Sequence, residues 1–168
     1  MLQKFANAID RLNETVGRYV SWLVLLMVCI AVAVVVLRYV FDIGFVWMQE
    51  LYVWLHGVLF TVGAGYTLLH DKHVRVDVLY AERSDKYRRI INICGTVFLL
   101  LPMLTVIAWS SFPYVMKSWQ SFESSYQVGG MKGVFVIKTM LLAFCVLLGL
   151  QAVSVLIRSF SKERQDDG

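Results

Sequence analysis

Four long stretches of the chain contain no charged residue, and the charge gathers in the short segments between them. The stretches cover residues 19–37, 51–69, 90–116 and 139–157. A helix needs about 20 apolar residues to cross the hydrocarbon core of a bilayer. In lipid, the backbone must also satisfy its own hydrogen bonds. The pattern therefore predicts four membrane-spanning helices, which we place at about 19–40, 51–69, 90–116 and 134–157.

These spans take up most of the chain, so we expect a single membrane domain over residues 1–168 with an all-α, four-helix-bundle fold. The composition agrees, because 58% of the residues are hydrophobic and only 17% are charged, against about a quarter in soluble domains. The first stretch is too long for a signal-peptide core, and no small-x-small cleavage site follows it. We expect it to be retained.

Ahead of the first span, apolar residues recur at steps of three and four, and cations recur at steps of seven. This pattern predicts a short amphipathic helix over about residues 2–17. It could lie in the cytoplasmic interface with its cations near lipid headgroups, or it could simply extend the first span. The apolar positions are Leu2, Phe5, Ile9, Leu12 and Val16, and the cations are Lys4, Arg11 and Arg18.

The sixteen Lys and Arg residues are unevenly shared between the two sides of the predicted membrane. Twelve precede the first stretch, lie between the second and third, or follow the fourth, whereas the other two loops hold four. Cytoplasmic loops carry the excess of cations. We therefore expect both termini and the middle loop in the cytoplasm. This bias accounts for the net charge of +4 without a nucleic-acid-binding surface.

Small residues and prolines mark positions where the spans pack or bend. Gly57, Thr61 and Gly65 recur at steps of four in the second span, a spacing that lets another helix backbone approach closely. That helix could belong to this chain or to a partner subunit. Pro102 and Pro113 predict a kink in the third span, because proline removes a backbone donor and clashes with the preceding turn.

Charged residues at the span ends form two candidate contacts. Arg38 and Glu50 flank the first outer loop, where an ion pair between them would fix the hairpin. In the middle loop, Arg75 and Asp77 follow His73 and could hold that loop against the bundle. A local ion pair is the simpler interpretation of each, and a contact with a partner is the alternative.

The spans themselves hold few polar groups. We expect His56 and Gln151 to form hydrogen bonds between helices, and Cys29, Cys94 and Cys145 to be buried packing residues. No span has a carboxylate near its middle or the paired glycines of an unwound binding helix, so we expect no translocation pathway in this chain alone.

Catalytic and cofactor motifs are also missing from the sequence. There is no glycine-rich phosphate loop, nucleophile elbow or Cys/His pair. Only one histidine lies inside a span, whereas a bis-histidine haem needs two at matched depth. His70 and His73 could hold a metal weakly, although solvated histidines are the simpler interpretation. We therefore predict no enzyme activity, no cofactor and no resident metal.

Several short segments form a distinctive set when they are taken together in order and spacing. They are residues 38–41, 47–51, 63–68, 73–77, 129–130, 137–138 and 150–151. This set resembles the DctQ-like small membrane subunit of tripartite ATP-independent periplasmic (TRAP) transporters. The details around Gln49-Glu50 and Gly129-Gly130 resemble its mannitol or chloroaromatic branch. Many family members have Ser-Glu-Glu after the tryptophan, where this chain has Met48-Gln49-Glu50 and keeps only the second acid.

This resemblance implies a three-part, sodium-coupled importer of an organic acid or related solute in the bacterial inner membrane. In such a system, a large permease subunit holds substrate and sodium and moves as an elevator, while the small subunit supports its scaffold within the membrane lipids. A periplasmic solute-binding protein would dock near residues 42–50 and 117–132. The alternative function is a self-sufficient, small homo-oligomeric transporter or channel.

Overall fold

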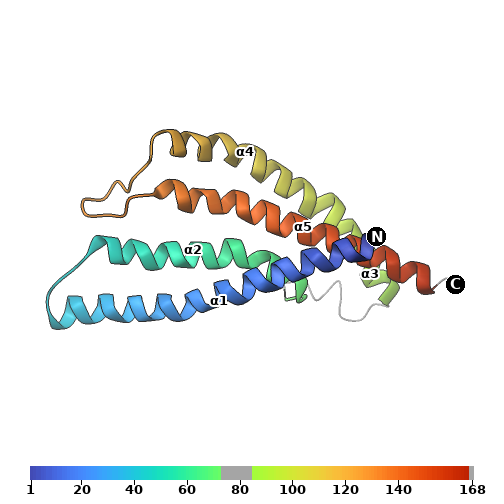
Figure 1. The fold of residues 1–168 in the computed structure, drawn as a ribbon, viewed down its shortest axis with the longest axis horizontal. Helices are drawn as coiled ribbons and strands as arrows, with labels where there is room; N and C mark the ends of the chain where they lie inside the picture. The colour runs from blue at the N-terminus through green and yellow to red at the C-terminus, as the bar shows by residue number, and fades with distance from the viewer. Residues whose placement is uncertain (73–84, 167–168) are drawn as a thin grey trace.

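The computed structural model describes residues 1–72 and 85–166, and within these ranges the regular structure is helical. Four helices are long and apolar enough to cross a membrane, the third of them running over Tyr87–Gln120. The predicted all-α class with four spans is therefore confirmed. In order, the elements are α1 (Leu2–Val40), α2 (Val46–Leu69), α3 (Asp85–Gly95), the π-helical segment η2 (Thr96–Leu100), α4 (Leu101–Gln120) and α5 (Val134–Asp166) (Figure 1).

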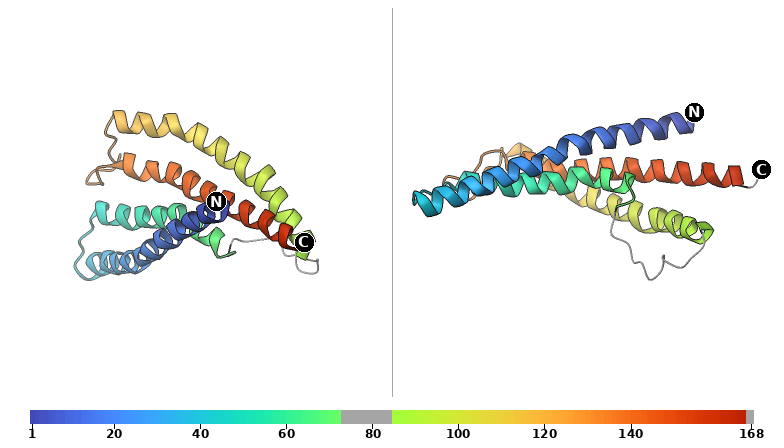
Figure 2. Two further views of the ribbon diagram at one scale, coloured as in Figure 1. Left: turned by 45° about the vertical axis from the view of Figure 1, so that its right-hand side comes forward. Right: turned by 90° about the horizontal axis from the view of Figure 1, so that it is seen from below.

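The spans lie side by side in the order α4, α5, α2, α1, and the N-terminal half of α1 crosses back over α5 (Figures 1 and 2). Helix α5 is central because it contacts each of the other three long helices. Within the described part of the chain, α4 packs against α5 but against neither α1 nor α2. Both termini lie at one end of the molecule, and the two short loops lie at the other.

Helix α1 is continuous over 39 residues, about 58 Å at 1.5 Å per residue, so the N-terminal segment extends the first span. Its buried face differs from the predicted apolar stripe. Leu2, Phe5 and Leu12 are exposed, whereas the buried residues are Ala6, Ile9, Asn13 and Gly17. Small side chains are selected on this face because α1 runs close to both α2 and α5.

Two helices extend beyond the predicted spans. Helix α2 begins at Val46 rather than near residue 51, so Glu50 lies one turn inside the helix. Helix α5 begins at Val134 as predicted but continues past residue 157 to Asp166. The predicted spans were placed between charged residues. A charged residue can end the membrane-crossing part of a helix, but the helix itself can continue beyond it.

The predicted proline distortion takes the form of a π-helical turn. Pro102 is the second residue after η2, and the backbone N–H of Leu101 between them donates to the carbonyl of Thr96, five residues back. Since proline has no N–H and its ring collides with the carbonyl four residues earlier, widening the turn relieves the collision. Pro113 lies within α4, which continues past it to Gln120.

Two glycines set the distance between α1 and α2. A Cβ on Gly65 would overlap Asn13 Oδ1 of α1 and lie 3.1 Å from the Leu147 carbonyl oxygen of α5, and a Cβ on Gly17 would overlap the Tyr66 ring. The predicted small-residue row thus contacts other helices of this chain.

The rest of the row is less crowded. A Cβ on Gly57 would lie 3.4 Å from Ile137 Cδ1, an ordinary contact. The Thr61 hydroxyl donates to the Gly57 carbonyl at 2.7 Å. Gly65 is therefore the position in this row where the absence of a side chain matters most.

We predict that Gly65→Ala destabilises the chain by about 1–3 kcal/mol, because the added methyl group overpacks the junction of three helices. Gly63→Ala is the matched control, since a Cβ there meets nothing within 4 Å. Denaturant unfolding in detergent micelles measures both. Equal midpoints for the two variants would show that the α1–α2 contact is looser than the structure indicates.

Candidate partner interface

A carboxylate in α2 holds the outer loop between α4 and α5. Glu50 accepts a hydrogen bond from the Met131 backbone N–H at 2.6 Å and another from the Ser125 hydroxyl. A Cβ on Gly130 would lie only 2.5 Å from Ser125 Oγ and 2.9 Å from Glu50 Oε1. The glycine therefore allows the loop backbone to close over the carboxylate.

The predicted ion pair between Arg38 and Glu50 is wrong. Both residues are described, and no ion pair forms between them; Arg38 is exposed near the end of α1. The reason is the early start of α2, which places Glu50 inside the helix and against the α4–α5 loop. Arg38 of α1 is close to Glu50 along the chain, but the orientation of α2 directs the Glu50 carboxylate toward the α4–α5 loop instead.

A second carboxylate fixes the same loop from its other side. Lys138 Nζ lies 2.5 Å from Glu123 Oε2, and both side chains are largely buried. The ammonium group also lies over the Tyr114 ring, 4.0 Å from its centroid. Hydrogen bonding from Lys138 holds the pKa of Glu123 below its usual value. The loop is thus tied to α5 as well as to α2.

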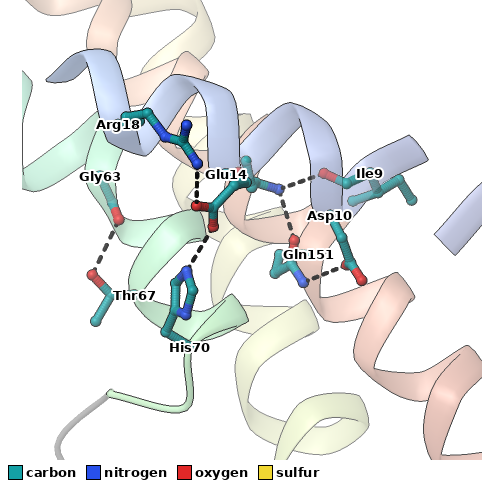
Figure 3. Close-up of polar contacts among 9 residues, drawn as sticks. Ile9, Asp10, Glu14, Arg18, Gly63, Thr67, His70 and Gln151 are labelled. Carbon is teal, nitrogen blue, oxygen red and sulfur yellow. Dashed lines mark hydrogen bonds and ion pairs between the residues drawn. The ribbon is translucent and has the colours of Figure 1, made fainter. Parts of the chain in front are cut away.

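At the other end of the bundle, a buried polar network joins α1 to α5 (Figure 3). Asn13 Nδ2 donates to Gln151 Oε1 at 2.9 Å, and Gln151 Nε2 donates to Asp10 at 2.9 Å. The same carboxylate accepts from Ser154 at 2.6 Å and pairs with Arg158. The hydrogen bond predicted between helices for Gln151 is confirmed.

His56 behaves differently from Gln151. Its side chain is exposed, and its ring packs on Phe60 of the same helix with centroids 4.6 Å apart. The structure shows no hydrogen bond to another described helix for it, so that expectation was wrong. One apolar span cannot indicate which of its polar residues faces inward.

A smaller ionic cluster joins α1 to the end of α2. Glu14 accepts from His70 at 2.7 Å and pairs with Arg18 at 3.3 Å, as Figure 3 shows. His70 is therefore engaged with a carboxylate of α1. The other candidate residues of the middle loop, His73, Arg75 and Asp77, lie outside the described residues.

The predicted burial of the cysteines holds for one of the three. Cys145 is buried in the core, whereas Cys29 and Cys94 are exposed. All three lie in apolar stretches, but in a membrane protein an apolar stretch has an outward face that is as apolar as its inward one. Burial within the chain therefore could not be deduced from hydropathy.

An open apolar groove of about 820 Å³ runs along α4 and α5. It exists because α4 packs against α5 alone among the other described spans. Small side chains line much of it, including Thr105, whose hydroxyl is satisfied by the Leu101 carbonyl at 2.8 Å. The other lining residues are Leu101, Leu104, Ala108, Trp109, Phe112, Pro113, Cys145, Val146, Gly149 and Val153.

Trp109 on this groove exposes a polar group at membrane depth. Its side chain is 83% exposed, and no hydrogen bond to its indole N–H forms within the described part of the chain. It lies eight residues before Lys117 and 20 residues after Arg89, about 12 Å and about 30 Å along the helix from the charged residues that flank this span. A donor there needs an acceptor that lipid tails lack, so the groove is the candidate surface for another membrane protein.

The family assignment rests on the whole set of spans. The family model described as "Tripartite ATP-independent periplasmic transporters, DctQ component" matches residues 27–162, which run from the middle of α1 to the last turns of α5. The chain belongs to the DctQ family. This DctQ-family chain is thus a small membrane component of a TRAP transporter. No curated protein and no solved structure matches it.

For this DctQ-family subunit, the sequence identified Glu50 but missed its partners and missed the α4–α5 groove. Ser125 and Met131 lie more than 70 positions from Glu50 and carry no motif. The one available signal was Gly130, because a glycine pair in a loop often marks close backbone approach.

We predict that Glu50→Ala releases the outer loop while Glu50→Gln releases it partly, since glutamine keeps one oxygen acceptor without the charge. Hydrogen exchange at the Met131 amide measures this release. The exchange rate should be slowest in wild type, faster in Glu50→Gln and fastest in Glu50→Ala. An unchanged rate in Glu50→Ala would show that the carboxylate does not hold the loop.

The Lys138–Glu123 pair predicts a pH dependence. Because the pKa of Glu123 is lowered in the folded state, its stabilisation is complete above the usual value of 4.5 and is lost as pH falls through the lowered value. The difference in unfolding free energy between wild type and Glu123→Gln should therefore be constant from about pH 7 to 5 and shrink in more acidic solution. A difference independent of pH would contradict the pairing.

Proposed function

We propose that this chain is the non-catalytic scaffold subunit of a sodium-coupled TRAP transporter that imports an organic acid or related solute. In this proposal it belongs to the mannitol or chloroaromatic branch and supports a large, elevator-type permease subunit. The apolar stretches of the four spans contain no charged residue, so this chain has no group suited to carry an ion or acid across the bilayer. Its role is then to hold a partner that does.

One observation carries the proposal: the α4–α5 groove is apolar, its lining includes the small residues Thr105, Ala108, Cys145 and Gly149, and it also includes the indole of Trp109, which has no partner in the described part of the chain. Small residues allow a further helix to approach closely in a membrane. A partner helix with an oxygen acceptor would satisfy Trp109, which lipid tails cannot do. We therefore assign this groove to a helix of the large permease subunit.

The two ends of the molecule fit the remaining parts of the proposal. The end with both termini carries most of the cations, so we place it in the cytoplasm and the protein in the bacterial inner membrane. At the opposite end, the loop fixed by Glu50 and Glu123 exposes Phe122, Tyr126 and Val128. A fixed loop with exposed apolar side chains suits docking of the periplasmic solute-binding protein, because little ordering entropy is lost.

The test places a bulky residue in the groove. Val146→Trp should lower the amount of large subunit that co-purifies by about tenfold or more, because an overfilled groove excludes the partner helix. Val32→Trp is the matched control: Val32 on α1 is 57% exposed and Val146 is 58% exposed, so both changes add the same bulk outside the core. Trp109→Phe keeps the ring, removes the N–H, and should give a smaller loss of about threefold.

The possible results test separately which helix face binds the large subunit and whether the chain acts as a scaffold. Loss of the large subunit in Val32→Trp but not in Val146→Trp would move the interface to α1. If the wild-type chain retains no large subunit and vesicles holding it alone transport an organic acid down a sodium gradient, the scaffold function is wrong. That result would support the self-sufficient homo-oligomeric transporter.

A further inference from the structure

A histidine at the end of α2 joins that helix to α1. His70 follows the last residue of α2, and its backbone N–H donates to the Tyr66 carbonyl oxygen at 3.1 Å. Its ring nitrogen Nε2 lies 2.7 Å from Glu14 Oε2 of α1 (Figure 3). The two side chains are 42% and 35% exposed, so water reaches both of them. The contact therefore links two helices through a group that can exchange its proton with solvent.

The His70 ring is also part of the packing between the two helices. It stacks on the Tyr66 ring, with the ring centroids 4.4 Å apart. The Tyr66 ring in turn covers Gly17 of α1, where an added Cβ would lie only 2.2 Å from Tyr66 Cγ. Glu14 and Gly17 are three residues apart and so share one face of α1. The position of the His70 ring is therefore coupled to the close contact of Tyr66 with α1.

Glu14 supplies a fixed negative charge to this contact. Hydrogen bonds from His70 and from Arg18 hold the pKa of Glu14 below its usual value of 4.5, so the carboxylate stays charged at neutral pH. A histidine ordinarily gains or loses its charge between pH 5 and 8. A positive charge at His70 is favoured by the carboxylate and by the carbonyl end of α2. A change of charge near neutral pH therefore falls on the histidine.

No second carboxylate is seen in contact with the His70 ring in the described part of the chain. Helix α5 also packs on α2, but its stretch 139–157 holds no charged residue and no histidine. The titratable side chain in that stretch, Cys145, is buried in the core. The described titratable residues next to His70 on α1 and at the end of α2 are Glu14, Arg18, Tyr66, Asp71 and Lys72.

Arg18 makes the contact between the helices reversible. Its Nη2 lies 3.3 Å from Glu14 Oε1, and the two residues are one turn apart on α1. When His70 is neutral, Glu14 keeps this partner on its own helix. The link to α2 can then weaken without leaving an unpaired carboxylate. The contact thus has two states that differ in the charge of one side chain.

We propose that Glu14 and His70 form a pH-sensitive latch between α1 and the C-terminal end of α2. The latch is closed when His70 is protonated, and it opens toward alkaline pH as a neutral hydrogen bond replaces the ion pair. In strong acid it opens again, because the contribution of Glu14 is complete above pH 4.5 and is lost as pH falls through its lowered pKa. The orientation given under the proposed function would place the latch in the cytoplasm, but the contact itself does not depend on that orientation.

The last turn of α2 should report the state of the latch. The Lys72 backbone N–H donates to the Thr67 carbonyl oxygen at 3.0 Å and closes this turn. Asp71 beside it has a φ of 57°, a left-handed conformation that residues other than glycine seldom adopt. Release of the His70 ring should therefore loosen the turn and expose the Lys72 amide.

The experiment measures hydrogen exchange at the Lys72 amide of the purified full-length chain in detergent, at pH 6 and at pH 8. His70→Gln keeps a side-chain N–H donor and removes the titratable charge. Relative to wild type at the same pH, this variant should exchange about three- to fivefold faster at pH 6 and at nearly the wild-type rate at pH 8. Comparison at equal pH cancels the intrinsic pH dependence of exchange.

His56→Gln is the matched control. His56 is an exposed histidine of the same helix, its ring packs on Phe60, and it forms no ion pair with a described residue. This variant should leave the exchange of the Lys72 amide unchanged at both pH values. In a Glu14→Gln background, His70→Gln should lose its pH-dependent effect, because the carboxylate that distinguishes a charged from a neutral histidine is gone.

Two results would overturn the latch. An equal effect of His70→Gln at pH 6 and pH 8 would show that the contact does not depend on the charge of the ring. A pH dependence that persists in the Glu14→Gln background would show that His70 responds to a different group. Both measurements use this chain alone, so they leave the large subunit and the α4–α5 groove untested, and the latch and the proposed function fail separately.

Discussion

A polar group buried between helices in a membrane must find its partner inside the protein, and the contact between α1 and α5 follows from that constraint. Asn13, Gln151 and Ser154 are completely or almost completely buried, and each bonds across the helix pair or to Asp10. Separation of α1 from α5 would remove the hydrogen-bond partners of these buried groups, which costs free energy. The network thus joins the α1–α2 hairpin to the α4–α5 hairpin, with Gly65 allowing the close approach.

The outer end obeys the same constraint with different groups. Glu50 and Glu123 are satisfied by donors from the α4–α5 loop and from Lys138, so the connection between hairpins is polar at both ends. Between these ends, the helices touch through apolar and small side chains. Such a chain is held in one arrangement without any charge in the apolar stretches of its spans, which agrees with the scaffold role proposed above.

Two buried side-chain atoms, Asn13 Oδ1 and Ser118 Oγ, have no hydrogen-bond partner in the described part of the chain, but the exposed polar groups without a partner indicate where other molecules could bind. Trp109 exposes a donor at membrane depth beside a groove that a helix could fill. Lys4 and Arg11 expose charge on the outer face of α1. These two surfaces lie on different helices. The position of α4 against α5 alone makes the first surface possible.

The sequence by itself determined the number and approximate position of the spans. Lipid favours apolar side chains along the whole of a crossing segment, so each span can be recognised from its own residues alone. It also indicated the family, since the match extends over most of the chain. Tertiary structure decided which face of each helix is buried: Cys29 and His56 face outward, Gly65 faces inward, and Glu50 bonds to Met131 rather than to Arg38. In a membrane both faces of a helix are apolar, so hydropathy does not indicate which face is buried. The packing of helices that are distant in sequence decides this.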